Sequence, residues 1–259
     1  MSTKDFLKKI KDEDIEYVDV RFTDTRGKLQ HVTIVSDLVD EDFVEEGFMF
    51  DGSSIAGWKS IEASDMKLML DTDTAYVDPF YAEKTICVHC SVVEPDTGEA
   101  YERDPRGTAQ KAEAYLKASG IGDVAYMGPE AEFFLFDNVK FSNSINKVSY
   151  EVDASDASWN TDTDYEMGNM GHRPGLKGGY FPVNPTDEAQ DLRAEMLSTM
   201  KRLGMKVDKH HHEVASCQHE LGLIFGELTE QADEIQKYKY VVHNVAHAYG
   251  KSATFMPKP

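Results

Sequence analysis

Two glutamates, Glu130 and Glu132, lie two positions apart in GPEAEFFLFD, a largely apolar segment in which we expect burial. On a β-strand, side chains at positions i and i+2 project from one face, so the two carboxylates are expected to lie side by side. Like charges repel each other there unless a cation lies between them. The pair is a candidate metal site, although an isolated pair of this kind is more often a solvated strand face.

A second segment with metal-ligand chemistry is KHHHEVASCQHELGLIF, residues 209–225. Between apolar flanks it carries six side chains that could bind a cation: His210, His211, His212, Glu213, His219 and Glu220. Carboxylates and imidazoles gathered on two strands of one sheet are typical of a site for hard divalent ions such as Mg²⁺ or Mn²⁺. For any single histidine, a solvated strand end is an equal alternative, so the hypothesis depends on both acidic segments.

A third candidate segment is FDGSSIAGW, residues 50–58. Its Asp51 precedes small residues that permit close approach by another surface. We expect Trp58 to be exposed there as a contact residue. An ordinary surface turn is the alternative, and from these residues alone it is the stronger one.

The composition limits the classes of partner. The 259 residues include 27 Lys and Arg against 47 Asp and Glu, a formal net charge of −20 that disfavours nucleic acid and anionic membrane surfaces. Three cysteines are too few for a disulfide framework and predict a reducing compartment, and the CVHC motif predicts packed strand thiols rather than zinc. No apolar run approaches the roughly 20 residues that span a bilayer, and MSTKDFLKKI lacks a signal peptide's apolar core. We therefore expect a soluble, cytoplasmic protein.

Residues 1–105 predict a small mixed β domain. The expected elements are a helix at 3–11 and strands at 15–24, 28–34 and 84–94. The first two strands are joined by a turn in which Gly27 takes a positive φ. In the first strand, the apolar side chains of Val18, Val20 and Phe22 share one face. Asp19 and Arg21 point the other way, as in a half-buried sheet.

Residues 106–259 predict strands that alternate with longer helices. One strand is expected at 125–137. The expected helices run from a Thr108 cap to Ser119, from a Thr186 cap to Gly204, and from near Thr229 to Gly250. The stretch 140–179 is polar and without period, which predicts a long loop.

Several long motifs, in this order, resemble those of bacterial type I glutamine synthetase. They are FDGSSIAGW, VEPDTGEAYERDPRGTAQKAE, GPEAEFFLFD, KGGYFPVNPTD, HHHEVASCQHE and the final ATFMPKP. The resemblance covers essentially the whole chain. It implies an α+β fold, with a small amino-terminal β-grasp-like domain followed by part of a larger antiparallel-sheet catalytic domain with flanking helices.

The resemblance also implies an activity, the ATP-dependent ligation of ammonia to L-glutamate through γ-glutamyl phosphate. By matching motifs, two or more Mg²⁺ or Mn²⁺ ions would be held by carboxylates. Glu132, Glu213 and Glu220 would bind the ion near glutamate and ammonium, and Glu130 the ion on the ATP phosphates.

The remaining roles follow from the same motifs. Asp51 would bind ammonium and take its proton as the catalytic residue. Tyr180, with Glu213 and Glu220, would line the substrate site, and Phe225 and His211 would contact ATP. The family's active sites form between subunits, so the resemblance implies a dodecamer of two hexameric rings.

Two departures from the family pattern bear on these expectations. The sequence covers a little more than half of a typical member, without the later metal-binding His and Glu and the phosphate-binding arginines, so we expect this chain alone to be inactive. The spacing from Glu213 to Glu220 is one residue shorter than in some enterobacterial members. Two alternatives stay open: a glutamine synthetase-like ligase that acts on another amine, and a non-catalytic metal-binding fragment.

Overall fold

A computed structural model of the chain describes residues 1–159, 166 and 171–259, and it divides them into two compact units. The first unit comprises Met1–Met127 and Glu227–Asp233, and the second comprises Gly128–Gly226 and Glu234–Pro259. A domain boundary between residues 105 and 106 stays a prediction.

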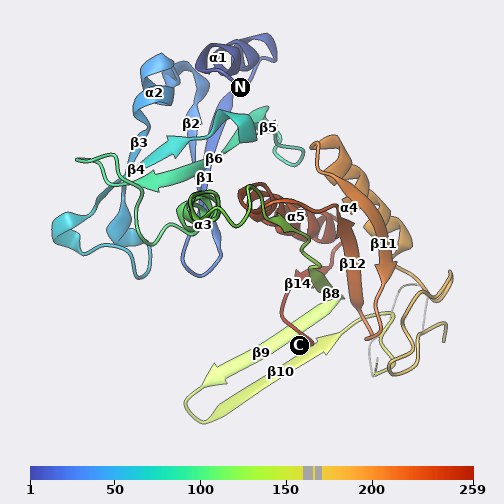
Figure 1. Cartoon of the computed structure of the whole chain (residues 1–259). Helices are drawn as coiled ribbons and strands as arrows, with labels where there is room; N and C mark the ends of the chain where they lie inside the picture. The colour runs from blue at the N-terminus through green and yellow to red at the C-terminus, as the bar shows by residue number, and fades with distance from the viewer. Residues whose placement is uncertain (160–165, 167–170) are drawn as a thin grey trace. The chain divides into compact units, whose positions relative to one another are not determined.

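A six-stranded sheet forms the centre of the first unit (Figure 1). Its strands are β1 (Tyr17–Thr23), β2 (Leu29–Val35), β3 (Phe48–Asp51), β4 (Asp65–Leu70), β5 (Tyr76–Val77) and β6 (Thr85–Val93). The order is β2-β1-β6-β4-β3, with β5 on β6, and only β1 and β6 run parallel among these pairs. This mixed topology agrees with the predicted small β domain.

The helices of the first unit are α1 (Thr3–Asp12), α2 (Glu41–Glu46) and α3 (Pro105–Ser119). α1 begins where the Ser2 side chain accepts from Asp5 N, and its Phe6 and Ile10 enter the core. α3 begins at Pro105 because Asp104 caps it, so the predicted Thr108 cap is wrong. The carboxylate of Asp104 accepts from Arg106 N at 3.1 Å and from Val92 N of β6 at 3.0 Å, which joins the helix start to the sheet.

β1 is buried on both faces, so the predicted half-buried pattern is wrong for its polar side. Asp19 is 0 % exposed and Arg21 is 2 % exposed. Arg21 donates to Asp19 Oδ2 at 2.6 Å and to Asp78 Oδ2 at 3.0 Å. Buried charges are tolerated when they are paired and hydrogen-bonded, and alternation in sequence does not reveal such pairing.

Trp58 contradicts its prediction, whereas the two cysteines of β6 agree with theirs. Trp58 is 5 % exposed and packs on Phe22 and Tyr101, so the expected exposed contact residue is a core residue. Cys87 and Cys90 are free and buried in β6, as expected for packed strand thiols.

The second unit contains a four-stranded antiparallel sheet with the strand order β11-β12-β8-β14. Its strands are β8 (Glu132–Phe136), β11 (Val207–His212), β12 (Gln218–Leu223) and β14 (Ser252–Thr254). Short strands β7 (Tyr126–Met127) and β13 (Gly226–Glu227) lie outside this sheet. The strand predicted at 125–137 is therefore interrupted between Met127 and Glu132.

Two long helices accompany this sheet, α4 (Gln190–Arg202) and α5 (Leu228–Ala248). α4 buries Leu192, Met196 and Met200, which are spaced by four residues, as predicted for its apolar face. It begins after Ala189, without a side-chain cap, so the predicted Thr186 cap is wrong. In α5, Tyr238, Val242 and Val245 are buried as predicted, but Tyr249 is 45 % exposed just beyond the helix end.

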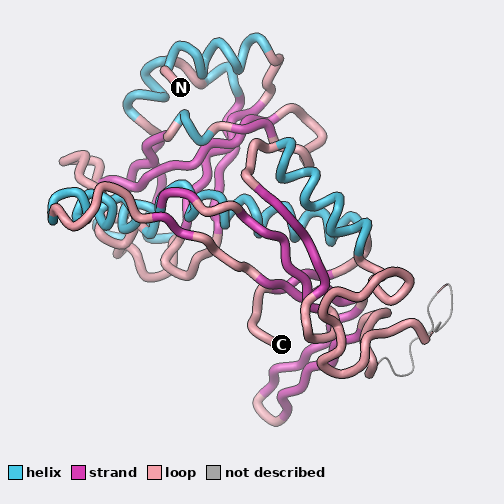
Figure 2. Tube along the Cα trace, turned by 45° about the vertical axis from the view of Figure 1, so that its right-hand side comes forward, coloured by secondary structure: helices cyan, strands magenta, loops and turns pink. Residues whose placement is uncertain are grey.

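A hairpin replaces the first part of the loop predicted at 140–179. Strands β9 (Asn138–Ser144) and β10 (Lys147–Asp153) pair antiparallel and form the two-stranded arm seen in Figures 1 and 2. Most of its residues are exposed, but apolar residues alternate with polar ones, at Val139 and Phe141 in β9 and at Val148, Tyr150 and Val152 in β10. The sequence therefore carried a strand signal here, and the prediction of a loop without period is wrong for this part. Residues 160–165 and 167–170 of the predicted loop lie outside the described residues.

Candidate metal and substrate site

Three predicted site residues form a row across the sheet of the second unit. His211 of β11 pairs with Glu220 of β12, and Glu220 pairs with Glu132 of β8. Residues that pair directly across antiparallel strands project from the same face, so their side chains share one surface. The register thus joins the two acidic segments that sequence analysis identified separately.

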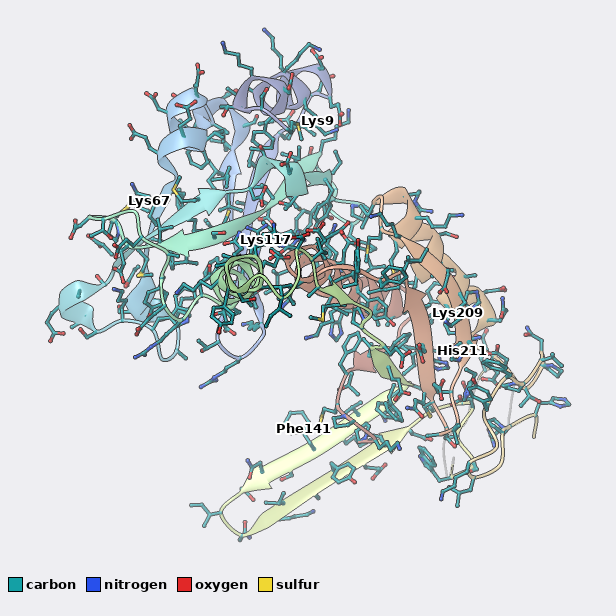
Figure 3. The ribbon with its side chains drawn as sticks, in the orientation of Figure 1. Lys9, Lys67, Lys117, Phe141, Lys209 and His211 are labelled. Carbon is teal, nitrogen blue, oxygen red and sulfur yellow. The ribbon has the colours of Figure 1, made fainter. Side chains whose placement is uncertain are left out.

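Glu213 completes a cluster with the first two members of this row. His211 Nδ1 lies 3.3 Å from Glu213 Oε1, and His211 Nε2 lies 3.8 Å from Glu220 Oε2. One ligand atom from each of these three residues lies within 4.8 Å of the others. Figure 3 labels His211 on β11, where its side chain lies among those of the neighbouring strands.

Glu130 and Glu132 border the cluster on the β8 side. Glu132 is the first residue of β8, and its carboxylate accepts from Gln218 Nε2. Both glutamates line a cavity of about 350 Å³ together with Phe134, Lys239 and Phe255. Both are exposed, so the expected burial is wrong, because Glu130 precedes the strand and Glu132 only begins it.

The acidic side chains of the cluster influence one another's titration. Burial raises the pKa of Glu220, His211 lowers it, and the negative charges of Glu213, Glu130 and Glu132 raise it further. The net direction of the Glu220 pKa is upward, led by burial, and the neighbouring carboxylates add to it. An oxygen-rich donor set with one imidazole fits a hard divalent cation such as Mg²⁺ or Mn²⁺.

A buried layer behind the cluster fixes the backbone of Glu213. His212, 1 % exposed, donates from Nε2 to Asp156 Oδ2 at 3.0 Å and from Nδ1 to the Glu213 carbonyl at 2.6 Å. Burial lowers the pKa of His212, but these two hydrogen bonds outweigh it and the pKa is raised. Asp156 and His212 also lie within 4.8 Å of His219, but His212 has both ring nitrogens occupied by acceptors, so we interpret this triad as structural.

Arg193 of α4 belongs to the same layer and was missed by sequence reasoning. Its guanidinium, 0 % exposed, forms a bidentate pair with Asp187 and lies 3.1 Å from His219 Nδ1. Burial lowers the pKa of His219, and the charges of His212 and Arg193 lower it further, so the neutral imidazole accepts from Arg193. The sequence signal that could have indicated its burial is its position directly after the apolar Leu192 of α4.

Two further predicted residues of the second unit lie at its surface. Tyr180 is 55 % exposed and stacks on Phe181 with ring centroids 3.9 Å apart, and its ring lies 5.9 Å from that of His211. Phe225 follows β12 and is 62 % exposed. Tyr180 thus borders the cluster through His211.

Asp51 belongs to the first unit, at the end of β3. Its Oδ1 accepts from the Ser53 hydroxyl at 2.6 Å and from Ser53 N at 2.8 Å, and its Oδ2 accepts from the Ser54 hydroxyl at 3.2 Å. These hydrogen bonds, led by the one from the Ser53 side chain, lower the pKa of Asp51. The exposed carboxylate is therefore held in its charged form.

A β-grasp-type mixed sheet and an antiparallel sheet that displays converging carboxylates define a two-domain α+β enzyme fold. Family models agree: residues 14–95 match "Glutamine synthetase, beta-Grasp domain" and residues 102–259 match "Glutamine synthetase, catalytic domain". The chain belongs to the glutamine synthetase family. This confirms the resemblance and the fold class predicted from the motifs.

Curated relatives carry the same family name. The glutamine synthetase of Cereibacter sphaeroides is 77% identical over 98% of this chain and 55% of its own length, and that of Rhodobacter capsulatus is 75% identical over 100% and 59%. That of Salmonella typhimurium is 54% identical over 100% of this chain and 55% of its own. The chain thus spans somewhat more than half the length of these relatives.

Solved structures show the same fold. A Plasmodium falciparum glutamine synthetase superposes with a TM-score of 0.92 at 26% identity, covering 100% of this chain and 51% of that one. A GmaS/ADP complex superposes with a TM-score of 0.75 at 23% identity, covering 98% and 52%, which shows the fold alone. Among the described residues, no helix has the length and apolarity needed to span a membrane.

Proposed function

We propose that this chain supplies the β-grasp domain and the carboxylate-bearing part of the catalytic domain to an enzyme that joins ammonia to L-glutamate at the expense of ATP. The observation that carries the proposal is the row of His211, Glu220 and Glu132 across three strands, with Glu213 beside it. Such a row brings carboxylates and an imidazole together, a donor set that a bound divalent cation would stabilise.

In this proposal, Glu132, Glu213 and Glu220 would hold one Mg²⁺ or Mn²⁺ ion that serves the glutamate and ammonium site, and Glu130 would hold another that serves ATP. When bound, such ions neutralise charge on the transferring phosphoryl group. Gln218 orients the Glu132 carboxylate, and His212 fixes the backbone of Glu213. These contacts hold the proposed ligand residues in position in the absence of a cation.

The proposed chemistry begins with transfer of the γ-phosphoryl group of ATP to the glutamate side chain. The resulting γ-glutamyl phosphate has a good leaving group, whereas a free carboxylate does not. Asp51, held as an anion by Ser53, binds ammonium and accepts one proton from it, so neutral ammonia attacks the acyl carbon and phosphate leaves. Tyr180 is proposed beside the ammonium, and His211 and Phe225 against ATP.

We extend the proposal to assembly and location. A dodecamer of two hexameric rings would let the Asp51 loop of one subunit serve the carboxylates of the next. A cytoplasmic location suits the three free cysteines, which are buried as thiols.

The test uses this chain and a chimera that extends it with the remaining part of the Cereibacter sphaeroides relative. The chimera is expected to form glutamine and phosphate with ammonium, and much less product with methylamine. Glu132→Gln and Glu220→Gln are expected to weaken Mn²⁺ binding at least about tenfold and to abolish the reaction. Glu151→Gln, on the exposed hairpin, is the matched control. Preference for methylamine would instead favour a ligase for another amine.

A further inference from the structure

Tyr238 of α5 is a fully buried tyrosine whose hydroxyl group connects strand β12 with the segment that leads into β8. Its hydroxyl donates to the carbonyl oxygen of Ala131 at 2.8 Å and accepts from the backbone N–H of Leu221 at 3.1 Å. Burial raises the pKa of Tyr238, so the group stays a neutral O–H that can both donate and accept.

The two backbone groups that Tyr238 connects lie next to candidate ligands. Ala131 is the residue between Glu130 and Glu132, and Leu221 directly follows Glu220. The register between β8 and β12 includes the pair of Glu132 and Glu220 but no pair involving Ala131. The β8–β12 pairing thus ends at Glu132 and Glu220. Beyond that pair, the Tyr238 hydroxyl connects the two segments through its hydrogen bonds to Ala131 and Leu221.

The ring of Tyr238 is held by aromatic packing. Its centroid lies 6.4 Å from that of Phe133 in an edge-on arrangement, and 6.0 Å from that of Phe255. Edge-to-face contacts at these separations are favourable and restrict the ring. The hydroxyl is thus presented from a rigid position, so the spacing of the two segments depends on helix α5.

We propose that Tyr238 is a positioning residue that sets the separation between the Glu130–Glu132 carboxylates and Glu220 for a divalent cation. This inference rests on the proposed function, because it requires these glutamates to be the ligands. Tyr238 would act on the proposed ligands indirectly, through its hydrogen bonds to the backbone of the adjacent residues Ala131 and Leu221. Partners of this indirect kind typically change metal affinity by about 10–100-fold.

The test is Mn²⁺ binding to the whole chain, measured by electron paramagnetic resonance of free Mn²⁺, for wild type and Tyr238→Phe. The control is Val242→Ala, which removes a buried side chain of the same helix without touching either strand link. Thermal unfolding of the metal-free proteins ranks the two variants by stability. A readout of metal affinity then separates a positioning role from general loosening of α5.

We expect Tyr238→Phe to weaken Mn²⁺ binding about tenfold, while Val242→Ala binds as wild type does even if it unfolds at a lower temperature. Equal affinity for Tyr238→Phe and wild type would overturn the inference, as would an equal loss in both variants. If wild type binds no Mn²⁺, the proposed metal site itself fails and the inference fails with it. The Mn²⁺ titration of the wild-type chain alone distinguishes failure of the metal site from failure of the Tyr238 inference.

Discussion

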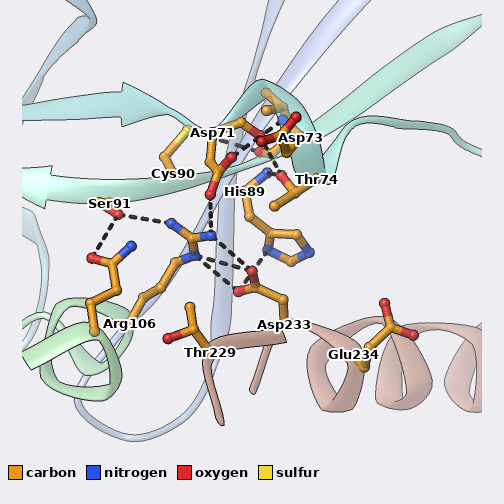
Figure 4. A network of polar contacts seen from close by, with 12 residues as sticks. Asp71, Asp73, Thr74, His89, Cys90, Ser91, Arg106, Thr229, Asp233 and Glu234 are labelled. Carbon is orange, nitrogen blue, oxygen red and sulfur yellow. Dashed lines mark hydrogen bonds and ion pairs between the residues drawn. The ribbon is translucent and has the colours of Figure 1, made fainter. Parts of the chain in front are cut away.

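Arg106 and Asp233 form a bidentate ion pair within the first unit, as Figure 4 shows. Arg106 Nε lies 3.0 Å from Asp233 Oδ1, and Nη2 lies 2.9 Å from Asp233 Oδ2. The same guanidinium donates to Asp71 and to the Ser91 hydroxyl. One buried side chain thus joins the start of α3, the β6 strand and the first turns of α5.

Replacement of Arg106 by methionine is expected to destabilise the protein strongly. The change keeps much of the volume but leaves Asp71 and Asp233 without their cation, and breaking a buried pair typically costs about 3–5 kcal/mol of unfolding free energy. Urea unfolding followed by circular dichroism measures the difference. Lys8→Met, which removes the cation of the surface pair with Asp12, is the control and is expected to change little. Similar losses in both variants would contradict this assignment.

Gly179 is expected to be required for the position of Glu213. A Cβ atom at Gly179 would lie 2.5 Å from the Glu213 carbonyl oxygen and 2.7 Å from the His212 ring, closer than van der Waals contact allows. Gly179→Ala should therefore displace the Glu213 segment, cost about 1–3 kcal/mol of stability and weaken Mn²⁺ binding. Isothermal titration calorimetry with Mn²⁺ and thermal unfolding measure the two effects.

Gly175→Ala provides the control for this prediction. A Cβ atom at Gly175 would meet nothing within 4 Å, so the variant is expected to bind Mn²⁺ and unfold as wild type does. Unchanged Mn²⁺ affinity in Gly179→Ala would show that the Glu213 segment adapts.

For the candidate site, the sequence was sufficient to predict that acidic strand segments meet but not the full arrangement of the side chains. Glu132 and Glu220 were predicted to meet because each lies on an apolar strand, and their register confirms that they do. Arg193 and Asp156 could not be predicted as partners of the two buried histidines, because long-range polar contacts leave no periodic pattern. The pairing of β9 with β10 was missed although Val139 and Phe141, and Val148, Tyr150 and Val152, alternate with polar residues, which is the pattern of a strand.

Ser53 is expected to control the charge of Asp51. Its hydroxyl and backbone N–H both donate to Asp51 Oδ1, so Ser53→Ala removes the side-chain hydrogen bond and keeps the other. The pKa of Asp51 should rise towards its ordinary value, because a hydrogen bond to the charged form is lost. Carbon-13 NMR titration of the carboxyl group measures the shift. Ser149→Ala, on the exposed strand β10, should leave the Asp51 titration unchanged, and an unchanged Asp51 pKa in Ser53→Ala would contradict the assignment.

Asp24 is expected to give the first unit a stability that disappears in acid. It is 6 % exposed, and its carboxylate accepts from Arg26 N at 2.9 Å, Lys28 N at 3.0 Å and Gln30 Nε2 at 3.1 Å. Burial raises the pKa of Asp24, but these hydrogen bonds outweigh it and the pKa is lowered. A carboxyl group with a depressed folded-state pKa stabilises the protein above its unfolded pKa of about 3.9 and loses that contribution as the pH falls through the folded value.

Asp24→Asn is therefore expected to lower the free energy of unfolding by about 1–2 kcal/mol at pH 7, because the amide loses the charge and one acceptor. The difference between variant and wild type should begin to shrink as the pH falls below about 4, where the unfolded carboxyl group takes up a proton, and should continue to shrink until the pH passes the lowered pKa of the folded carboxylate. Urea unfolding at pH 7, 5 and 3 measures this dependence. Asp123→Asn, at an exposed position, should track wild type throughout. A difference for Asp24→Asn that is equal at all three pH values would show that the lost hydrogen bonds, and not the charge, carry the effect.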